Sequence, residues 1–202
     1  MTLLTPWLGR LALIALALFP AAASAFAADE QQAGDEQAAW AALAGGGHIA
    51  LIRHGNAPPG YGGDPPGFRI DDCKTQRNLD DKGRAQGKAL GDAFRSHGVT
   101  VDRILSSLVC RCMDTASLMA VGNVESSWAL VPDRDPNRPR LRELKEIVSS
   151  WRGPGTLVLV SHGFTIEPLT GIMPDQAEVV VLRPTPGIGN GASIVGRIPA
   201  PR

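Results

Sequence analysis

The sequence predicts an α/β protein, a three-layer α/β/α sandwich with a mainly parallel central sheet and an antiparallel edge strand or hairpin. Two compact, largely apolar runs, at 48–53 and 156–160, are typical of strands that are buried on both faces of a sheet. Segments with helical spacing of apolar residues separate these runs from a further strand candidate at 103–106. Strands that alternate with helices favour a parallel sheet with helices packed on its faces.

The individual elements are expected between Gly- and Pro-rich segments that end them. Helices are expected at 36–43, 80–97, 110–120, 141–151 and 166–169. Strands are expected at 48–53, 103–106, 128–131 and 156–160, and a closing hairpin at 178–182 and 193–198. Residues 56–72, crowded with Gly and Pro, are expected to form a loop.

Length and composition describe an ordinary globular chain. The 202 residues, 44% hydrophobic and 20% charged, suit one domain with one substantial core. Lys plus Arg number 20 and Asp plus Glu number 20, so the protein has no long-range field that would attract nucleic acid or anionic lipid. We therefore expect no nucleic-acid partner, and any anion-binding site must be local.

The first residues have the order of a secretory signal peptide. Arg10 precedes the apolar run 11–19, and the small residues that follow include Ala-Phe-Ala at 25–27, which fits the A-x-A cleavage rule. The apolar run is shorter than the roughly 20 residues that span a bilayer, which favours a cleaved signal over a stable membrane anchor. We expect a periplasmic or secreted protein. Its parts are a signal peptide at 1–27, a polar lead-in at 28–46 and the functional domain at 47–202.

The three cysteines leave several pairings open. In an oxidising compartment a disulfide can persist, and Cys73 can pair with either Cys110 or Cys112. Cys110 and Cys112 stand two residues apart on a predicted helix, point to different faces and make a poor pair. Free, partly buried thiols are the alternative. No Cys-x-x-Cys spacing is present and the four histidines are scattered, so we expect no metal site.

Two of the predicted strands end in a histidine that is followed by a glycine. The first strand runs into Arg53 and His54, and the later one into His162. Ligands of open α/β sheets bind beyond the carboxyl ends of the strands, so both histidines fall at the ligand-binding edge. Arg111 belongs to the same edge, because it lies in the first turn of the helix that follows the strand at 103–106.

This set of side chains suits a phosphate group. Arg guanidinium forks match phosphate oxygens bidentately and stay charged at any relevant pH. A neutral imidazole can attack phosphorus and carry it as phosphohistidine until water removes it. A second, cationic imidazole adds a donor to the same oxygens. The residue types therefore indicate phosphoryl transfer at a point that Arg53, His54, Arg111 and His162 surround.

The pattern resembles the histidine phosphatase superfamily, which includes the phosphoglycerate mutases and acid phosphatases. The resemblance rests on three pieces in order, and it covers roughly residues 48–198. The pieces are Leu-Ile-Arg-His-Gly at 51–55, then Ser106-Ser107 with Cys110-Arg111 and Thr115-Ala116, then Val-Ser-His-Gly at 160–163. The resemblance implies that His54 is the phosphorylated nucleophile and that Arg53, Arg111 and His162 form the phosphate pocket. In its small size and its signal-peptide pattern, the chain resembles an exported bacterial branch of this superfamily.

The chain departs from the family pattern before the first long helix. Family members of this kind usually have Asn, then Leu, then Ser or Thr, and the hydroxyl helps to bind phosphate. Here Asn78 keeps its expected place among the phosphate-binding residues, whereas Asp80 replaces the hydroxyl and is expected to cap the helix. Gln76 and Arg77, just upstream, are expected to be solvated loop residues.

The general acid stands in no clear motif. Protonation of the leaving oxygen needs a carboxylic acid near the phosphoryl group. Acid phosphatase relatives place an Asp directly after the second histidine, where this chain has Gly163. Among Glu125, Asp133 and Asp135, which lie where mutase-like relatives carry a Glu, we expect Asp133 to act because it follows a predicted strand end.

Two functions are compatible with these residues. The first is an exported phosphatase that hydrolyses a phosphomonoester through a covalent phosphohistidine on His54, with no metal or organic cofactor. The loop 56–72, with Tyr61, Phe68 and Arg69, is expected to set its specificity. Resemblance to small exported relatives implies an envelope sugar phosphate as the small-molecule substrate. The alternative is a non-catalytic protein that binds a phosphate ligand or serves as a scaffold and keeps the fold.

Overall fold

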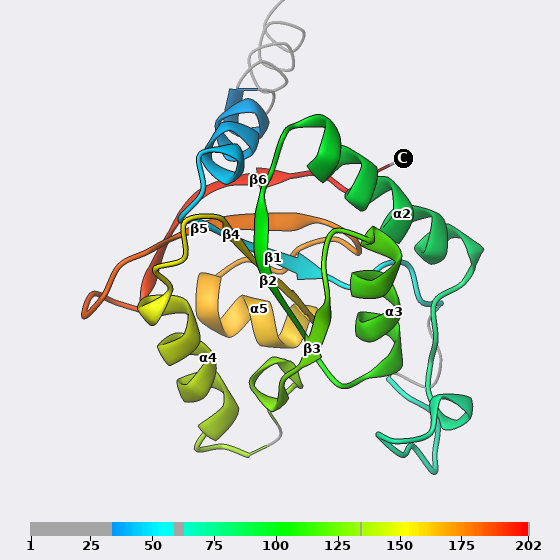
Figure 1. Ribbon diagram of the computed structural model, residues 1–202. Coiled ribbons are helices and arrows are strands. Elements are labelled where there is room, and N and C mark those ends of the chain that lie inside the picture. The colour runs from blue at the N-terminus through cyan, green and yellow to red at the C-terminus, as the bar shows by residue number, and fades with distance from the viewer. Residues whose placement is uncertain (1–33, 59–62, 134, 202) are drawn as a thin grey trace, which may run out of the picture.

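The computed structural model describes residues 34–58, 63–133 and 135–201, and it is an α/β fold around one six-stranded sheet (Figure 1). The strand order is β3-β2-β4-β1-β5-β6. The strands are β1 (Ile49–Arg53), β2 (Val101–Ser106), β3 (Val124–Ser126), β4 (Thr156–Ser161), β5 (Val179–Pro184) and β6 (Ala192–Ile198). The helices are α2 (Asp81–Ser96), α3 (Cys110–Met119), α4 (Pro139–Ser150) and α5 (Gly163–Thr170), with a further helix at 34–44 and two 3-10 turns, η1 (Cys73–Thr75) and η2 (Trp128–Leu130).

The strand directions confirm the predicted mixed sheet. Three neighbouring pairs are parallel: β1 with β4, β4 with β2, and β2 with β3. β5 runs antiparallel to β1, and β6 runs antiparallel to β5, so the closing hairpin forms the other edge. The parallel strands are joined through helices, which is the connection that parallel pairing requires.

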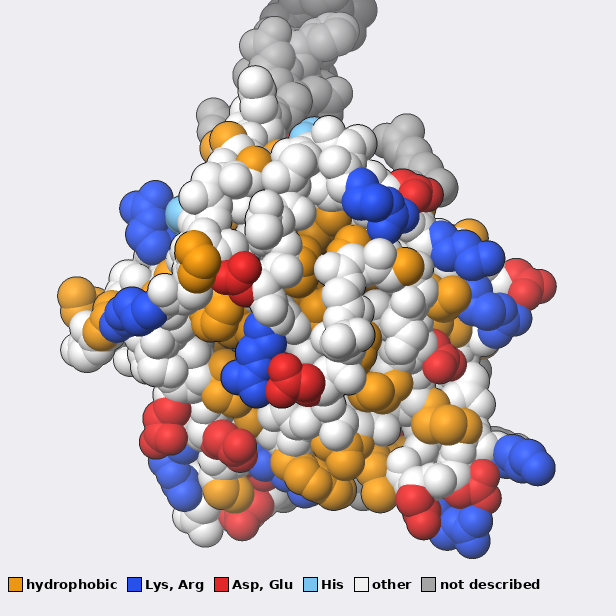
Figure 2. All heavy atoms as spheres, viewed as in Figure 1, with side chains coloured by type: hydrophobic (Ala, Val, Ile, Leu, Met, Phe, Trp, Pro, Cys, Tyr) orange, Lys and Arg blue, Asp and Glu red, His pale blue; other side chains and the backbone are white. Residues whose placement is uncertain are grey.

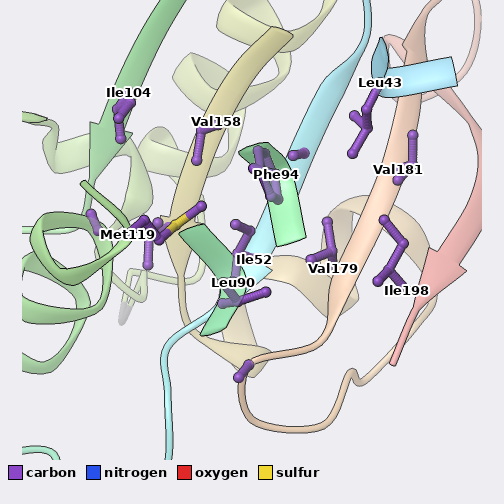
Figure 3. Packing of buried hydrophobic residues seen from close by; sticks show 14 of the residues in the cluster. Leu43, Ile52, Leu90, Phe94, Ile104, Met119, Val158, Val179, Val181 and Ile198 are labelled. Atoms are coloured by element: carbon purple, nitrogen blue, oxygen red, sulfur yellow. The ribbon is translucent and has the colours of Figure 1, made fainter. Parts of the chain in front are cut away.

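The core lies on both faces of the sheet, which divides the apolar residues of each strand between two clusters. On one face, Ala50 and Ile52 of β1 pack with Leu90 and Phe94 of α2 and with Met119 of α3 (Figure 3). Backbone contact between α2 and α3 is close because Gly91 carries no side chain: a Cβ there would stand 1.9 Å from the Met119 carbonyl oxygen.

The opposite face carries the second cluster, which completes the three layers. Ile49 and Leu51 of β1 pack there with Leu144 of α4 and with Ile166 of α5. Successive residues of β1 therefore face different helical layers, as a strand buried on both sides must do. The predicted α/β/α sandwich is confirmed.

One predicted strand is wrong. Residues 128–131 were expected as a strand, but Trp128–Leu130 forms the 3-10 turn η2, and the third strand is Val124–Ser126. β3 is short and lies at the sheet edge beside β2, so it shows little apolar patterning. The apolar residues Ala129 and Leu130 are fully buried because η2 packs into the α4 and α5 cluster. A short apolar run is compatible with a buried strand and with a buried 3-10 turn, so the sequence pattern does not distinguish them.

The helix at 34–44 belongs to the folded domain rather than to a separate lead-in. Ala39, Trp40 and Leu43 are buried in the cluster that also holds α2 and α3. The predicted signal peptide at 1–27 lies outside the described residues. Within the described ranges, no helix combines the length and apolar character needed to cross a membrane. On the face shown in Figure 2, basic and acidic side chains are interspersed with apolar ones.

Cys73 and Cys110 form a disulfide, and Cys112 is free and buried. The bond therefore selects one of the pairings that the sequence left open. It joins the turn η1 to the first residue of α3 across a sequence separation of 37. Its position beside Arg111 ties the loop after β1 to the helix that carries a predicted phosphate ligand.

Replacing Cys73 with serine is expected to lower the free energy of unfolding by about 4 kcal/mol, because the unfolded chain regains the freedom of a loop of this size. Urea denaturation of the oxidised protein and of the variant measures the difference. A reducing agent should destabilise the parent protein by a similar amount and leave Cys73→Ser unchanged. Equal stability of the oxidised parent and the variant would contradict a stabilising disulfide.

Candidate active site

Three parallel strands deliver their following residues to one edge of the sheet. β1 is followed by His54, β2 by Ser107 and β4 by His162. The strands end level with one another, since Arg53 lies opposite Ser161 in the pairing of β1 with β4. This places the two histidines together, with ring centres 5.4 Å apart.

His54 is held with one ring nitrogen toward the site. Its Nδ1 lies 2.8 Å from the Gly55 carbonyl oxygen, which can only accept, so Nδ1 carries the proton in the neutral ring. Nε2 then has a lone pair, and it accepts a hydrogen bond from Arg111 Nε at 3.2 Å. The His54 side chain is buried, and its unprotonated nitrogen faces Arg111.

Arg111, in the first turn of α3, contacts both histidines. Its Nη2 donates to His162 Nδ1 at 3.3 Å, beside the bond from Nε to His54. The other end of the guanidinium forms an ion pair with Asp64, with Nη1 2.7 Å from Oδ1 and Nη2 3.3 Å from Oδ2. Nη1 also lies 3.3 Å from the Arg77 carbonyl oxygen.

His162, the N-cap of α5, has the opposite tautomer. An arginine can only donate, so Nδ1 of His162 accepts the hydrogen bond from Arg111. The proton of the neutral ring is then on Nε2, which donates to Ser107 Oγ at 2.9 Å. Cys112 Sγ lies 3.4 Å from the same Nε2. The His162 ring is thus oriented by residues that follow β2 and begin α3.

The loop after His54 packs against the starts of α2 and α3. The Gly55 N–H donates to Thr115 Oγ1 at 3.0 Å, and Thr115 Oγ1 donates to the Arg111 carbonyl oxygen at 2.7 Å. A Cβ on Gly83, near the start of α2, would stand 2.1 Å from the Asn56 carbonyl oxygen. Asp80 caps α2 by accepting from the Gly83 N–H at 2.8 Å, which confirms the role expected for it.

A cavity of about 660 Å³ opens in front of these residues. Four arginines line it, Arg53, Arg77, Arg111 and Arg138, and buried Nε atoms of Arg53 and Arg77 have no hydrogen-bond partner among the described residues. Apolar side chains line it as well, with Phe164 75% exposed and Met173 41% exposed. The other apolar lining residues are Ala129, Val131, Pro132 and Leu141. The cavity therefore offers both cationic groups for an anion and apolar surface.

Residues 49–130 match the family model described as histidine phosphatase superfamily, branch 1. This part of the chain is therefore similar to that superfamily. It is similar to the serine/threonine-protein phosphatase Pgam5, mitochondrial, of Drosophila grimshawi, with 29% identity over 114 residues, which are 54% of this chain and 34% of the fly protein. The aligned part thus spans about a third of that relative.

Solved structures of phosphatases show a similar fold. The protein histidine phosphatase SixA complexed with tungstate has a TM-score of 0.55 and 14% identity, covering 75% of this chain and 96% of that one. A variant of phosphoserine phosphatase from Entamoeba histolytica with bound phosphoserine has a TM-score of 0.50 and 15% identity, covering 74% and 95%. At these identities the likeness concerns the fold.

The histidine phosphatase fold brings together most of the residues predicted for the site. Arg53, His54, Arg111, His162 and Asp133 all line the cavity. Asn78 was expected to bind phosphate, but it is absent from the cavity lining, and its exposed side chain donates to the Cys73 carbonyl oxygen at 2.7 Å. The described geometry thus gives Asn78 a role in shaping the turn η1.

The loop after β1 contributes residues other than those expected to set specificity. Phe68 and Arg69 do not line the cavity, and Tyr61 lies outside the described residues. Asp64 and Arg77 line it instead. Asp64 lies in a Gly- and Pro-rich loop, where no sequence pattern identifies it as a site residue. Arg77 was expected to be an ordinary solvated loop residue. Nowhere in the described ranges do three or more His, Cys, Asp or Glu side chains form a group that could hold a metal ion.

Both histidines are held neutral. Burial, and then the charge of Arg111, lower the pKa of His54 from 6.5 to about 3, although the hydrogen bond to Gly55 opposes the shift. Burial, followed by Arg111, likewise holds the pKa of His162 well below its usual value. A neutral imidazole at position 54 keeps its lone pair across the physiological pH range.

The shifted pKa values predict how stability depends on pH. Below pH 6.5 the unfolded imidazoles take up protons, whereas the folded ones stay neutral down to about pH 3 for His54. Stability from this source is complete above pH 6.5 and falls as the pH drops, by about 1.4 kcal/mol per pH unit for each histidine. Urea denaturation at pH 7, 6 and 5 measures the slope. His54→Asn should reduce it; equal slopes in the parent and in His54→Asn would contradict the assignment.

Proposed function

We propose that the protein hydrolyses a phosphomonoester through a covalent phosphohistidine on His54, without a metal or organic cofactor. The observation that carries this proposal is the unprotonated Nε2 of His54, which contacts Arg111 near His162 in the arginine-lined cavity. A buried neutral imidazole with a directed lone pair is an activated nucleophile. The match of residues 49–130 to the histidine phosphatase superfamily model supports the same chemistry.

The phosphoryl group would bind between the two histidines and the arginines. Its oxygens would take over the N–H groups of Arg111 that now contact His54 and His162, and would gain the free Nε–H of Arg53. Guanidinium groups offset the charge that spreads over the equatorial oxygens during transfer. Charge stabilisation in a water-poor pocket is worth more than the same contacts in bulk water.

The reaction then proceeds in two displacements. His54 Nε2 forms a bond to phosphorus, the bond from phosphorus to the ester oxygen breaks, and the leaving oxygen takes a proton from an acid. Water next attacks phosphorus, the bond to Nε2 breaks, and the proton of the water passes to the conjugate base of that acid. Inorganic phosphate leaves and His54 returns to its neutral form.

We assign the general acid to Asp133, which lines the same cavity as His54 and His162. Backbone N–H groups hold its carboxylate, from Asp135 at 3.2 Å and from Arg140 at 2.9 Å. Glu167, an exposed residue of α5, lines the same cavity and is the matched comparison.

Leaving groups of different basicity test this assignment. An alkoxide leaving group needs the proton and p-nitrophenolate does not, so Asp133→Asn should lower kcat by about 100-fold or more for an alkyl phosphate and only slightly for p-nitrophenyl phosphate. Release of inorganic phosphate from both substrates is measured for the parent, Asp133→Asn and Glu167→Gln. A selective loss in Glu167→Gln alone would move the acid to Glu167, and no hydrolysis of either substrate by the parent would overturn the proposed function.

The substrate we propose is a small phosphorylated molecule, with an envelope sugar phosphate as the expected case. The apolar side chains of Phe164 and Met173, which line the cavity, can also pack against an aryl leaving group. This makes p-nitrophenyl phosphate a suitable probe. A panel of sugar phosphates beside it would rank the two kinds of leaving group by kcat/KM.

Export to the periplasm or the exterior is part of the proposal. It rests on the signal-peptide pattern at 1–27, and the disulfide between Cys73 and Cys110 supports it because disulfides persist in oxidising compartments. Expression with its own first residues in a bacterial host, followed by fractionation, would test it: the shortened protein should appear in the periplasmic fraction.

A non-catalytic phosphate-binding protein is the alternative. It is favoured by one observation, that no described hydrogen bond joins a carboxyl group to either active-site histidine. Tungstate or phosphate binding without hydrolysis of any ester would select this alternative.

A further inference from the structure

Asp64 and Arg111 form an ion pair at the edge of the proposed phosphate site, in which Arg111 is buried and Asp64 is partly exposed. The two side chains are 14% and 6% exposed, and both oxygens of the carboxylate face the guanidinium. Burying two charges carries a large desolvation penalty, so such a pair is weak evidence for stability alone. A carboxylate beside a proposed phosphate site also repels the negative charge of the ligand. The presence of Asp64 there therefore calls for a specific role.

The contacts of Arg111 show what the pair does to its orientation. Asp64 takes the Nη1 and Nη2 end of the fork, and the Nε and Nη2 edge is thereby turned toward His54 and His162. That edge is the one that a phosphoryl group at His54 Nε2 would contact. An arginine released from Asp64 could rotate about its side-chain bonds and lose this alignment.

Asp64 is itself held in place from the backbone. Its Oδ1 accepts from the Arg77 N–H at 3.1 Å, and the Arg77 carbonyl oxygen accepts from Arg111 Nη1 at 3.3 Å. The segment that carries Arg77 is joined to α3 by the disulfide of Cys73 and by Gln76, whose Oε1 accepts from the Cys110 N–H at 2.8 Å. Burial raises the pKa of the Asp64 carboxyl, but hydrogen bonds from Arg111 and Arg77 outweigh this and lower it, so the carboxylate is charged at neutral pH.

We propose that Asp64 is a positioning residue that holds the Arg111 guanidinium in the orientation needed to bind the phosphoryl group. The inference deepens the proposed function, because it concerns the same site, but its main test is anion binding and needs no turnover. Asp64 touches Arg111 and the Arg77 backbone, and it acts on the phosphoryl group through Arg111.

Tungstate binding to the full chain, measured by isothermal titration, tests the proposal. Asp64→Asn keeps the shape of the side chain but removes its charge and one acceptor, and it should weaken tungstate binding about tenfold or more. Asp71→Asn, in the same loop and with an 83% exposed side chain, is the matched control and should bind as the parent does. Unchanged or tighter binding by Asp64→Asn would overturn the proposal, and tighter binding would instead make Asp64 a competitor of the anion.

A double-mutant comparison separates positioning from a general structural effect. In an Arg111→Lys background there is no fork to orient, so Asp64→Asn should change tungstate affinity by less than about twofold. An equal loss in both backgrounds would contradict the role. If Asp64→Asn does not fold, Asp64→Glu, which keeps the charge on a longer side chain, takes its place. We then expect Asp64→Glu to bind tungstate more weakly than the parent, and the Arg111→Lys, Asp64→Glu pair to bind it within about twofold of Arg111→Lys alone. Where the parent binds tungstate but hydrolyses nothing, the proposed function fails and this inference still receives its answer.

Discussion

Replacing His54 with alanine is expected to lower kcat for p-nitrophenyl phosphate by about 10⁴-fold or more. The variant lacks the ring nitrogen to which we assign attack on phosphorus, the unprotonated Nε2 that contacts Arg111. Removing the ring leaves Arg53 and Arg111 in the cavity, so tungstate should still bind. Steady-state hydrolysis and titration calorimetry measure the two effects separately.

His97→Ala is the matched control for this variant. His97 ends α2 and stacks on Trp40 with ring centres 4.2 Å apart, and it does not line the cavity that holds His54 and His162. Its turnover should equal that of the parent. Turnover that persists in His54→Ala would remove His54 from the role of nucleophile, whatever the control shows.

Arg111→Ala is expected to lower kcat/KM by about 10³-fold, the second largest effect of a single substitution. Arg111 contacts both histidines and presents the guanidinium edge that would neutralise the transferring phosphoryl group, and arginines in this position of phosphoryl transfer are worth about 10³-fold or more. The variant also leaves the Asp64 carboxylate without its ion-pair partner beside the site. Initial rates over a range of substrate concentrations, together with tungstate affinity, measure the loss.

Arg103→Ala provides the comparison on the protein surface. Arg103 pairs with Glu125 across β2 and β3, and both side chains are about half exposed. Its loss should leave kcat/KM within a factor of about two, because exposed ion pairs contribute little. A similar fall in both variants would point to general destabilisation, and an active Arg111→Ala would contradict its place in the phosphate pocket.

The parts of the site that could be predicted are those that local sequence determines. Arg53, His54 and His162 directly follow or end buried strands, so the apolar run and the parallel sheet together place them. Arg111 could be placed because it opens a helix after a third strand. In each case a short stretch of chain defines both the element and the position of the side chain on it.

The parts that could not be predicted depend on contacts between distant segments. Asp64 lies 47 residues from Arg111 in the chain, and only the folded loop after β1 brings its carboxylate to the guanidinium. Asn78 was expected in the pocket by resemblance, yet the turn η1 and its disulfide direct the side chain to the Cys73 carbonyl oxygen. The 3-10 turn at Trp128–Leu130 was expected as a strand because burial under α4 gives it the same apolar pattern.

Trapping the phosphorylated protein tests the central proposal most directly. The full chain is mixed with p-nitrophenyl phosphate, quenched at neutral pH because phosphohistidine is labile in acid, digested and analysed by tandem mass spectrometry. We expect one phosphoryl group on the peptide that contains His54, localised to that residue, and none in His54→Ala. Steady turnover with no phosphoryl group on the protein, or with one on another residue, would contradict a phosphohistidine at His54.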